Sequence, residues 1–174
     1  MPPNSLRSSL NLTRLLLPAV LGLLLSSCSG PAFNRAWKQA QHQPPADAVC
    51  GQWTGTWKSD FNGHHGKLQC VVTPPAKPGQ PHGFFYRATW LRILSGAYRA
   101  EHTVKPAGKA AWTLSGSHEM PSWAGGLYTY EGKLTPETFT ARYECEIDHG
   151  TYTLSRPESA AAANKTLAKS HDTP

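Results

Sequence analysis

The chain has 174 residues, a length that fits one domain with appendages. Its 15 glycines, 15 prolines, six tryptophans and six tyrosines are typical of an all-β fold with many turns, because aromatic residues favour strands and glycine and proline favour turns. The 17 Lys and Arg residues outnumber the 11 Asp and Glu residues, but the positive charges are scattered along the chain. A modest, dispersed excess of this kind favours solubility or a weak attraction to anionic surfaces, and it argues against nucleic-acid binding.

The N-terminus has the composition of a targeting segment. Residues 1–14 contain two arginines and no acidic residue, and residues 15–25 form an uncharged, leucine-rich stretch. This stretch is too short to span a bilayer, which takes about 20 apolar residues, but it matches the core of a signal peptide. It ends in Leu25-Ser26-Ser27-Cys28, which resembles the lipobox of bacterial lipoproteins. The resemblance implies that residues 1–27 are removed and that the Cys28 thiol carries lipid; an ordinary secretory signal with a chance cysteine is the alternative.

The resemblance to lipoproteins also implies where the protein lies. Several acyl chains on one cysteine give a lasting membrane anchor, since each buried CH₂ contributes about 0.8 kcal/mol. By analogy with enteric bacteria, Ser29 in place of Asp after Cys28 points to the outer membrane and its periplasmic face. We therefore expect a cell-envelope protein that is attached to the membrane by its lipid.

Two segments flank the predicted domain of residues 50–157. Residues 28–49 mix Ala, Gln and a proline pair, as in a stiff tether. Phe33 and Trp37 lie four residues apart among good helix formers. The segment therefore has two alternative interpretations: a short helix that plugs one end of the domain, or an unstructured tether. Residues 158–174 hold few apolar residues and are expected to be disordered or to form a frayed helix.

Between these segments, apolar and polar residues alternate in short runs separated by Gly, Pro, Asn or Asp, the pattern of strands joined by turns. No stretch between the runs is long enough for a helical crossover, so the strands are expected to be antiparallel. Short turns between consecutive strands favour an up-and-down barrel, whose closure removes exposed edges. The eight predicted strands cover about residues 51–58, 66–73, 83–91, 96–105, 109–118, 127–134, 137–146 and 151–156.

The first and last strands carry a family resemblance. Gly51-Gln52-Trp53 opens the first strand and Arg156 ends the last, a pair similar to the Gly-x-Trp motif and the closing arginine of the calycins (lipocalins, avidins and their relatives). The resemblance implies that the guanidinium packs over the Trp53 indole and closes the barrel floor by a cation–π contact. It also implies a binding module and not an enzyme. Trp53 and Trp57 lie four apart on one strand, so both should face the interior.

Aromatic residues at inward positions are the candidate ligand contacts. An eight-stranded barrel is just wide enough either to fill itself with side chains or to hold one small ligand. An open interior would bind a small apolar or amphipathic ligand or a lipid, whereas a filled one would serve as a structural or protein-interaction module of the envelope. The candidate contacts are Trp53, Trp57, Tyr86, Trp90, Tyr128, Tyr130, Tyr143 and Arg156.

Histidines offer two further chemistries. His64 and His65, with His149 in a turn expected at the same end of the barrel, could contribute to a surface transition-metal site. They also suit a polar turn that faces water, and the lack of a standard metal-ligand spacing favours the turn. The tandem Gly-x-Trp motif is also similar to haem-binding nitrobindin-type barrels, which would make His102 or His118 an axial ligand. We assign no cofactor from the sequence.

Cysteines and catalytic patterns give weaker indications. Besides Cys28, the chain has Cys50, Cys70 and Cys145. An exported protein can form one disulfide from these three, and the strand phases favour Cys70–Cys145, with a buried reduced thiol as the alternative. No Gly-x-Ser-x-Gly nucleophile elbow and no phosphate-binding loop occur in the sequence. We therefore expect a protein that is not an enzyme.

Overall fold

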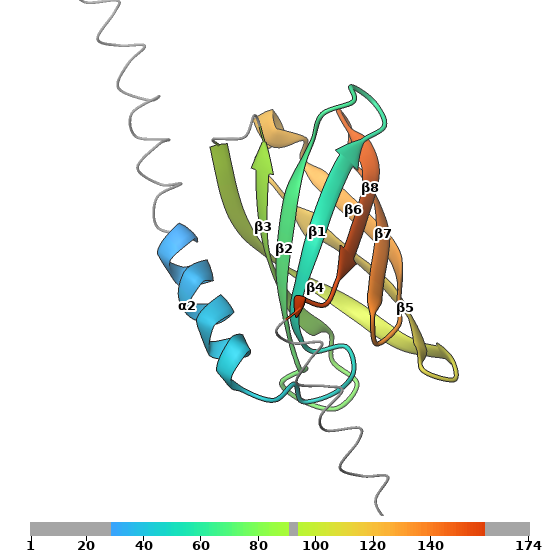
Figure 1. The fold of residues 1–174 in the computed structure, drawn as a ribbon. Helices are drawn as coiled ribbons and strands as arrows, with labels where there is room; N and C mark the ends of the chain where they lie inside the picture. Colours follow the sequence, from blue (N-terminus) through green and yellow to red (C-terminus); the bar gives the residue numbers. More distant parts are fainter. Residues whose placement is uncertain (1–28, 91–93, 159–174) are drawn as a thin grey trace, which may run out of the picture.

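The computed structural model describes residues 29–90 and 94–158, so the predicted signal peptide, Cys28 and most of the predicted tail lie outside the described residues. One helix, α2 (Ser29–His42), precedes eight strands, and a short 3₁₀ helix, η1 (Ser122–Ala124), lies between the fifth and sixth (Figure 1). Within the described residues, no helix is both long and apolar enough to cross a bilayer. The strands are β1 (Gly51–Ser59), β2 (His65–Thr73), β3 (His82–Trp90), β4 (Leu94–Gly108), β5 (Ala111–Glu119), β6 (Leu127–Leu134), β7 (Thr138–Glu144) and β8 (His149–Ser155).

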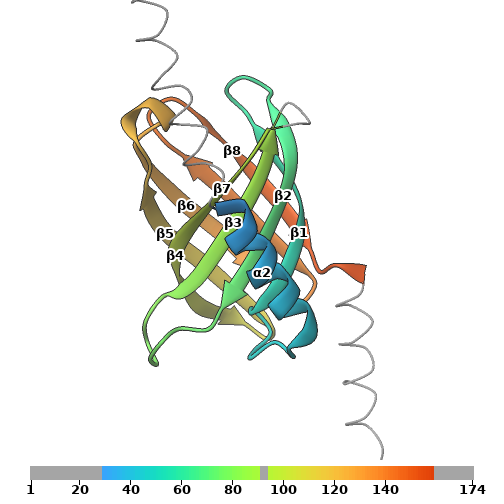
Figure 2. The same cartoon turned by 90° about the vertical axis from the view of Figure 1, so that its left-hand side faces the viewer.

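The eight strands form one closed barrel in which each strand pairs with the next along the chain and β8 pairs with β1. Every pairing is antiparallel, which confirms the predicted all-β up-and-down barrel and is consistent with a calycin-like fold (Figures 1 and 2). The closing pair brings two backbones very close, because a Cβ on Gly55 would lie 2.0 Å from the carbonyl oxygen of Thr153. Closure therefore requires glycine at this position of β1.

The two ends of the barrel differ, and we call them the mouth and the floor. The mouth, at the top in Figure 1, carries the turns after β1, β5 and β7, and the floor carries the loops after β2, β4 and β6. At the mouth, the Asp60 N–H donates to the His149 carbonyl oxygen at 2.8 Å, and the Ser59 hydroxyl donates to Asp148 at 2.6 Å. These bonds confirm that the turns after β1 and β7 lie at the same end.

The floor half of the barrel is filled by large apolar side chains. Trp53 is fully buried, its indole N–H donates to the Val49 carbonyl oxygen at 2.9 Å, and its ring meets Phe139 edge-on at 5.8 Å. Trp57 packs against the same core from further along β1, which confirms that both indoles face one interior. Because full burial of a large apolar side chain contributes about 1.5–3 kcal/mol, the burial of Trp53 and its neighbours stabilises the closed barrel.

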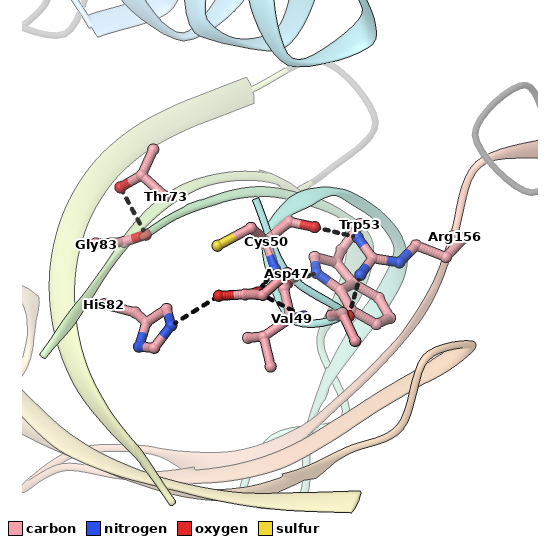
Figure 3. Close-up of polar contacts among 9 residues, drawn as sticks. Asp47, Val49, Cys50, Trp53, Thr73, His82, Gly83 and Arg156 are labelled. Atoms are coloured by element: carbon pink, nitrogen blue, oxygen red, sulfur yellow. Dashed lines mark hydrogen bonds and ion pairs between the residues drawn. The ribbon is translucent and has the colours of Figure 1, made fainter. Parts of the chain in front are cut away.

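Arg156 closes the floor. Its guanidinium lies 3.7 Å from the centre of a Trp53 ring, which confirms the contact implied by the calycin resemblance (Figure 3). It also donates to the carbonyl oxygens of Cys50 at 2.8 Å, Gln52 at 3.2 Å and Pro136 at 3.2 Å. Burial lowers the pKa of Arg156 to about 10, so the group is still charged at neutral pH. One side chain thus ties the end of the barrel to its beginning.

Helix α2 lies along the outside of the barrel, beside β2 and β3 (Figure 2). Phe33 is fully buried there against Val71 and Phe85, and its ring lies 5.1 Å from Phe85. The guanidinium groups of Arg87 and Arg99 lie over the Phe33 and Phe85 rings at 4.7 and 3.8 Å. The segment expected to be a tether is therefore largely a docked helix. It covers the wall instead of plugging an end, because β2 and β3 present an outward apolar pair to Phe33.

The arginine contact gives the first testable prediction. Arg156→Lys keeps the charge but loses the flat guanidinium over the indole and leaves buried carbonyl oxygens without a donor. We expect it to lower the free energy of unfolding by about 2–3 kcal/mol in urea titrations. The matched control is Arg142→Lys on the exposed face of β7, which should change stability by less than about 0.5 kcal/mol. Equal effects of the two changes would show that Arg156 does not hold the floor.

Candidate functional site

A cavity of about 300 Å³ opens at the mouth of the barrel. Its walls come from β1, β2, β3, β4, β6, β7 and β8 together with the segment around η1. The lining is mostly aromatic, and Asp148 is the one charged residue among the lining residues that the structure describes. The aromatic lining residues are Trp57, Trp90, Tyr98, Tyr128, Tyr130, Tyr143 and Tyr152.

Two larger hollows, of about 650 and 630 Å³, extend across β5 to β8. Most of the side chains that line them are exposed polar or charged groups of the outer sheet face, such as Thr113, Glu131 and Arg142. Ligand sites are usually concave, mainly apolar and furnished with a few placed polar groups. The smaller cavity at the mouth fits that description better, so it is the candidate site.

Tyrosines define the chemistry of the barrel interior. All six tyrosines of the chain belong to the interior core, including Tyr98 on β4 and Tyr152 on β8. The hydroxyl groups of these two lie 3.1 Å apart, and the Tyr86 and Tyr98 rings stack at 5.1 Å. Burial raises the pKa of Tyr130 to about 12 and those of Tyr86, Tyr98 and Tyr152 well above the ordinary value. The phenols are therefore neutral at physiological pH.

Hydrogen bonds hold the rim of the cavity in place. Asp148 accepts from the Tyr143 hydroxyl at 3.0 Å and from the Ser59 hydroxyl at 2.6 Å. The Tyr128 hydroxyl donates to the Ala124 carbonyl oxygen at 2.9 Å, and the Trp57 indole N–H donates to the Thr89 carbonyl oxygen at 3.0 Å. Most of these contacts join a strand to a turn, and the bond from Trp57 to Thr89 joins β1 to β3, so the aromatic walls are held in place by hydrogen bonds.

His102 is the least satisfied polar residue of the interior. It is fully buried on β4, and neither ring nitrogen has a hydrogen-bond partner. Its ring fits because β5 has no side chain at Gly116, where a Cβ would lie 2.3 Å from His102 Nδ1. Burial first, and then the nearby His118, lowers the pKa of His102 to about 4. The histidine is thus a neutral ring inside an aromatic core.

The predicted ligand contacts fall into two groups. Five of them line the mouth cavity: Trp57, Trp90, Tyr128, Tyr130 and Tyr143. Trp53, Tyr86 and Arg156 instead belong to the packed core and the floor. The sequence analysis missed Tyr98 and Tyr152, which also line the cavity. Both lie on inward positions of predicted strands. Applying the period-two alternation of inward and outward side chains to those two strands would have identified them.

The histidines considered as haem ligands do not suit that role. Ring centres of Phe84, Tyr130 and Tyr86 lie 4.7, 4.9 and 5.9 Å from that of His102, so a haem could reach its nitrogens only by displacing the core. His118 stacks on Tyr98 at 5.5 Å. The residues present therefore do not fit a haem inside this barrel.

The three cysteines that the structure describes, Cys50, Cys70 and Cys145, are unbridged, so the expected bond between Cys70 and Cys145 is not formed there. Cys70 is fully buried in the wall, paired in register with Trp53 and Tyr86. Strand β7 ends at Glu144, earlier than expected, so Cys145 leaves the strand and lies close to Gly125 near the mouth. The side chain of Cys145 contacts the Tyr128 hydroxyl at the mouth.

The histidines considered for a metal site do not form a cluster of metal ligands. His64, His65 and His149 are exposed at the mouth, and His65 bonds only to the carbonyl oxygen of Gly63 in its own turn. Among the described residues, a group of three side chains with metal-ligand spacing occurs at the floor instead, and it consists of Asp47, Cys50 and His82. Sequence reasoning missed this group, because Asp47 in the linker before β1 and His82 at the start of β3 lie 35 positions apart.

Comparison with known proteins adds no relative: no protein-family model matches this chain, and a search of curated proteins finds no match.

The buried histidine gives the second prediction, which concerns pH. The unfolded chain binds a proton at His102 below about pH 6.5, whereas the folded protein does so only near pH 4. Stability present above pH 6.5 is therefore lost as the pH falls towards 4, by about 2–3 kcal/mol. His102→Phe should remove this loss and raise stability at pH 7.5 by about 1 kcal/mol, because the unpartnered nitrogens disappear.

Urea unfolding at pH 7.5 and pH 4.5 measures both effects. Burial also lowers the pKa of His118. Because His118 is present both in the parent and in His102→Phe, its contribution to the acid sensitivity is the same in both proteins. The exposed His65→Phe is the matched control and should keep the acid sensitivity of the parent protein. An equal loss of stability in His102→Phe and in the parent would contradict the assignment.

Proposed function

We propose that this protein is a non-enzymatic binding module that holds a small, neutral or weakly basic amphipathic ligand in the mouth of its barrel. One observation carries the proposal: an aromatic cavity of about 300 Å³ opens to solvent above a filled core. This volume lies at the lower end of the range of small-molecule sites. The ligand is accordingly expected to be compact.

The electrostatics of the cavity favour some ligands over others. Its described lining has no lysine or arginine, its phenols are neutral, and its one charged group is the Asp148 carboxylate at the rim. Aromatic faces attract cations, whereas an anion would meet a carboxylate with no positive partner. We therefore expect the site to favour neutral or cationic amphiphiles over fatty acids and other anions.

The third prediction uses two fluorescent probes that differ in charge. N-phenyl-1-naphthylamine is neutral, and 8-anilinonaphthalene-1-sulfonate has the same rings with a sulfonate. We expect saturable binding of the neutral probe at one site and at least roughly tenfold weaker binding of the sulfonate. Asp148→Asn should reduce the difference in affinity between the two probes, because it removes the negative charge and keeps an acceptor oxygen for the hydroxyls of Ser59 and Tyr143.

Filling the cavity tests the location of the site. Ala88 on β3 lines the cavity, so the larger side chain of Ala88→Phe should occupy the cavity and lower the affinity for the neutral probe about tenfold or more. Thr129→Phe, on the exposed face of β6, is the matched control and should bind like the parent. The proposal fails if neither probe binds the folded protein, or if Ala88→Phe and Thr129→Phe bind alike.

We further propose that the barrel is anchored to a bacterial membrane by lipid on Cys28, with the outer membrane as the favoured location. The basic segment, short apolar core and lipobox-like run of the leader support this. Helix α2 begins at the next residue, Ser29, and packs on the barrel through Phe33. An anchor at Cys28 would therefore hold the barrel close to the membrane surface, without a long flexible tether.

The fourth prediction concerns this anchor. Protein expressed in a bacterial host should incorporate labelled palmitate and partition into detergent, and Cys28→Ser should do neither. Cys145→Ser controls for labelling of a thiol elsewhere in the chain and should behave as the parent. Incorporation that survives Cys28→Ser would reject the anchor but would leave the ligand proposal intact.

One observation favours a second candidate, a protein-interaction module of the envelope. In the described residues, the large hydrophobic side chains that are exposed all lie at the mouth, and Trp123 in η1 is 83 % exposed. Exposed apolar side chains gathered at one end often mark a contact surface. Photo-crosslinking from position 123 in cells separates the candidates, since one recurrent protein adduct without probe binding would favour the second. The exposed side chains are Phe61, Trp90, Leu94, Trp123, Leu127 and Ile147.

A further inference from the structure

We infer that Asp47, Cys50 and His82 form a binding site for a divalent transition-metal ion of zinc type at the floor of the barrel. The three residues come from two segments: Asp47 and Cys50 lie in the linker between α2 and β1, with Cys50 just before the strand, and His82 is the first residue of β3. One donor atom of each lies within 4.8 Å of the donor atoms of the other two. Figure 3 shows the Cys50 sulfur, the Asp47 carboxylate and the His82 ring turned towards one another.

The hydrogen bonds of Asp47 leave one of its oxygens available. Oδ1 accepts from the backbone N–H groups of Val49 and Cys50, each at 2.8 Å. Oδ2 faces His82 Nε2 at 3.6 Å, which is longer than a hydrogen bond. The turn therefore fixes the carboxylate through one oxygen and presents the other to the histidine and the thiol.

The other two residues have unused capacity that a purely structural role does not explain. His82 Nδ1 is buried without a hydrogen-bond partner, and Cys50 is a buried, unbridged thiol. The turn cap occupies Oδ1 of Asp47, while Oδ2 has only the longer ion-pair contact with His82 and the Cys50 thiol beside it. A metal ion would use the free carboxylate oxygen, the imidazole and the sulfur together, and these donors are the ones zinc prefers.

The geometry suits four-coordinate zinc after a small adjustment. Bonds of about 2.0–2.3 Å in a tetrahedron place the donor atoms about 3.3–3.8 Å apart. Side-chain rotations that move each donor atom by about 1 Å would bring the three donor atoms from their present separations to that spacing. On binding, the Cys50 thiol releases its proton to solvent and the sulfur bonds to the metal. Three protein ligands then leave the fourth position to water.

The site has both an entry path and a structural consequence. A groove of about 270 Å³ between the end of α2 and the floor is lined by Cys50, Pro45 and Thr73, among others. An ion bound here would fasten the linker and β1 to the start of β3. Metal should therefore raise the thermal midpoint of unfolding, because it binds only the folded arrangement.

The test uses the full chain in detergent micelles, reduced and stripped of metal with a chelator. We expect the parent to take up one Zn²⁺ per chain, and its Co²⁺ adduct to show a thiolate-to-cobalt charge-transfer band in the near ultraviolet. Cys50→Ser should lose the band, and His82→Gln and Asp47→Asn should weaken Zn²⁺ binding at least roughly tenfold. Asp47→Asn keeps Oδ1 for the backbone, so it separates loss of metal from loss of the turn.

Matched controls lie at the mouth of the barrel. The double change His64→Gln and His65→Gln removes two exposed histidines, and Cys145→Ser removes the thiol near the mouth; both should retain Zn²⁺ binding and the cobalt band. Near-ultraviolet circular dichroism checks that each variant is folded. If Cys50→Ser does not fold, the loss of Zn²⁺ binding in Asp47→Asn tests the site instead. The inference is overturned if the parent binds no more Zn²⁺ than Asp47→Asn, or if the mouth variants lose binding instead.

Discussion

The closure of β1 against β8 is the constraint on which the rest of the structure depends. Gly55 allows the two backbones to approach, and Arg156 reaches from the end of β8 to the indole of Trp53 and to carbonyl oxygens around it. Once the sheet is closed, strand alternation sends every second side chain into one interior of limited width. Aromatic residues fill its floor half, and towards the mouth they line a cavity without filling it.

Most of the fold could be predicted from local pattern, because period-two alternation and turn residues act over a few positions. The shared face of Trp53 and Trp57 and the contact of Arg156 follow from that alternation and from a short motif. The docking of α2 could not be predicted in the same way. Phe33 needs an outward apolar pair on β2 and β3, and that pair exists only once the strands have paired.

The candidate sites were harder to predict for the same physical reason. The mouth cavity was recognisable in outline, since five of its aromatic residues lie on inward positions of predicted strands. The cluster of Asp47, Cys50 and His82 depends on how the linker before β1 packs against the start of β3, which no local periodicity specifies. The early end of β7 at Glu144 likewise placed Cys145 in the segment that follows the strand. The two ends therefore differ in structure: the floor holds the barrel closed, and the mouth is lined by an aromatic cavity, where we propose that a ligand binds.

The central claim is that the mouth cavity holds a compact amphipathic molecule. Native mass spectrometry of protein purified gently from the membranes of its own host tests this most directly, because it reports the intact complex and its non-covalent cargo. The account predicts a species heavier than the acylated chain by one small molecule, which is released on activation and is absent when the cavity is filled at position 88. A spectrum containing only the unliganded chain, from preparations in which the protein is folded, would contradict it.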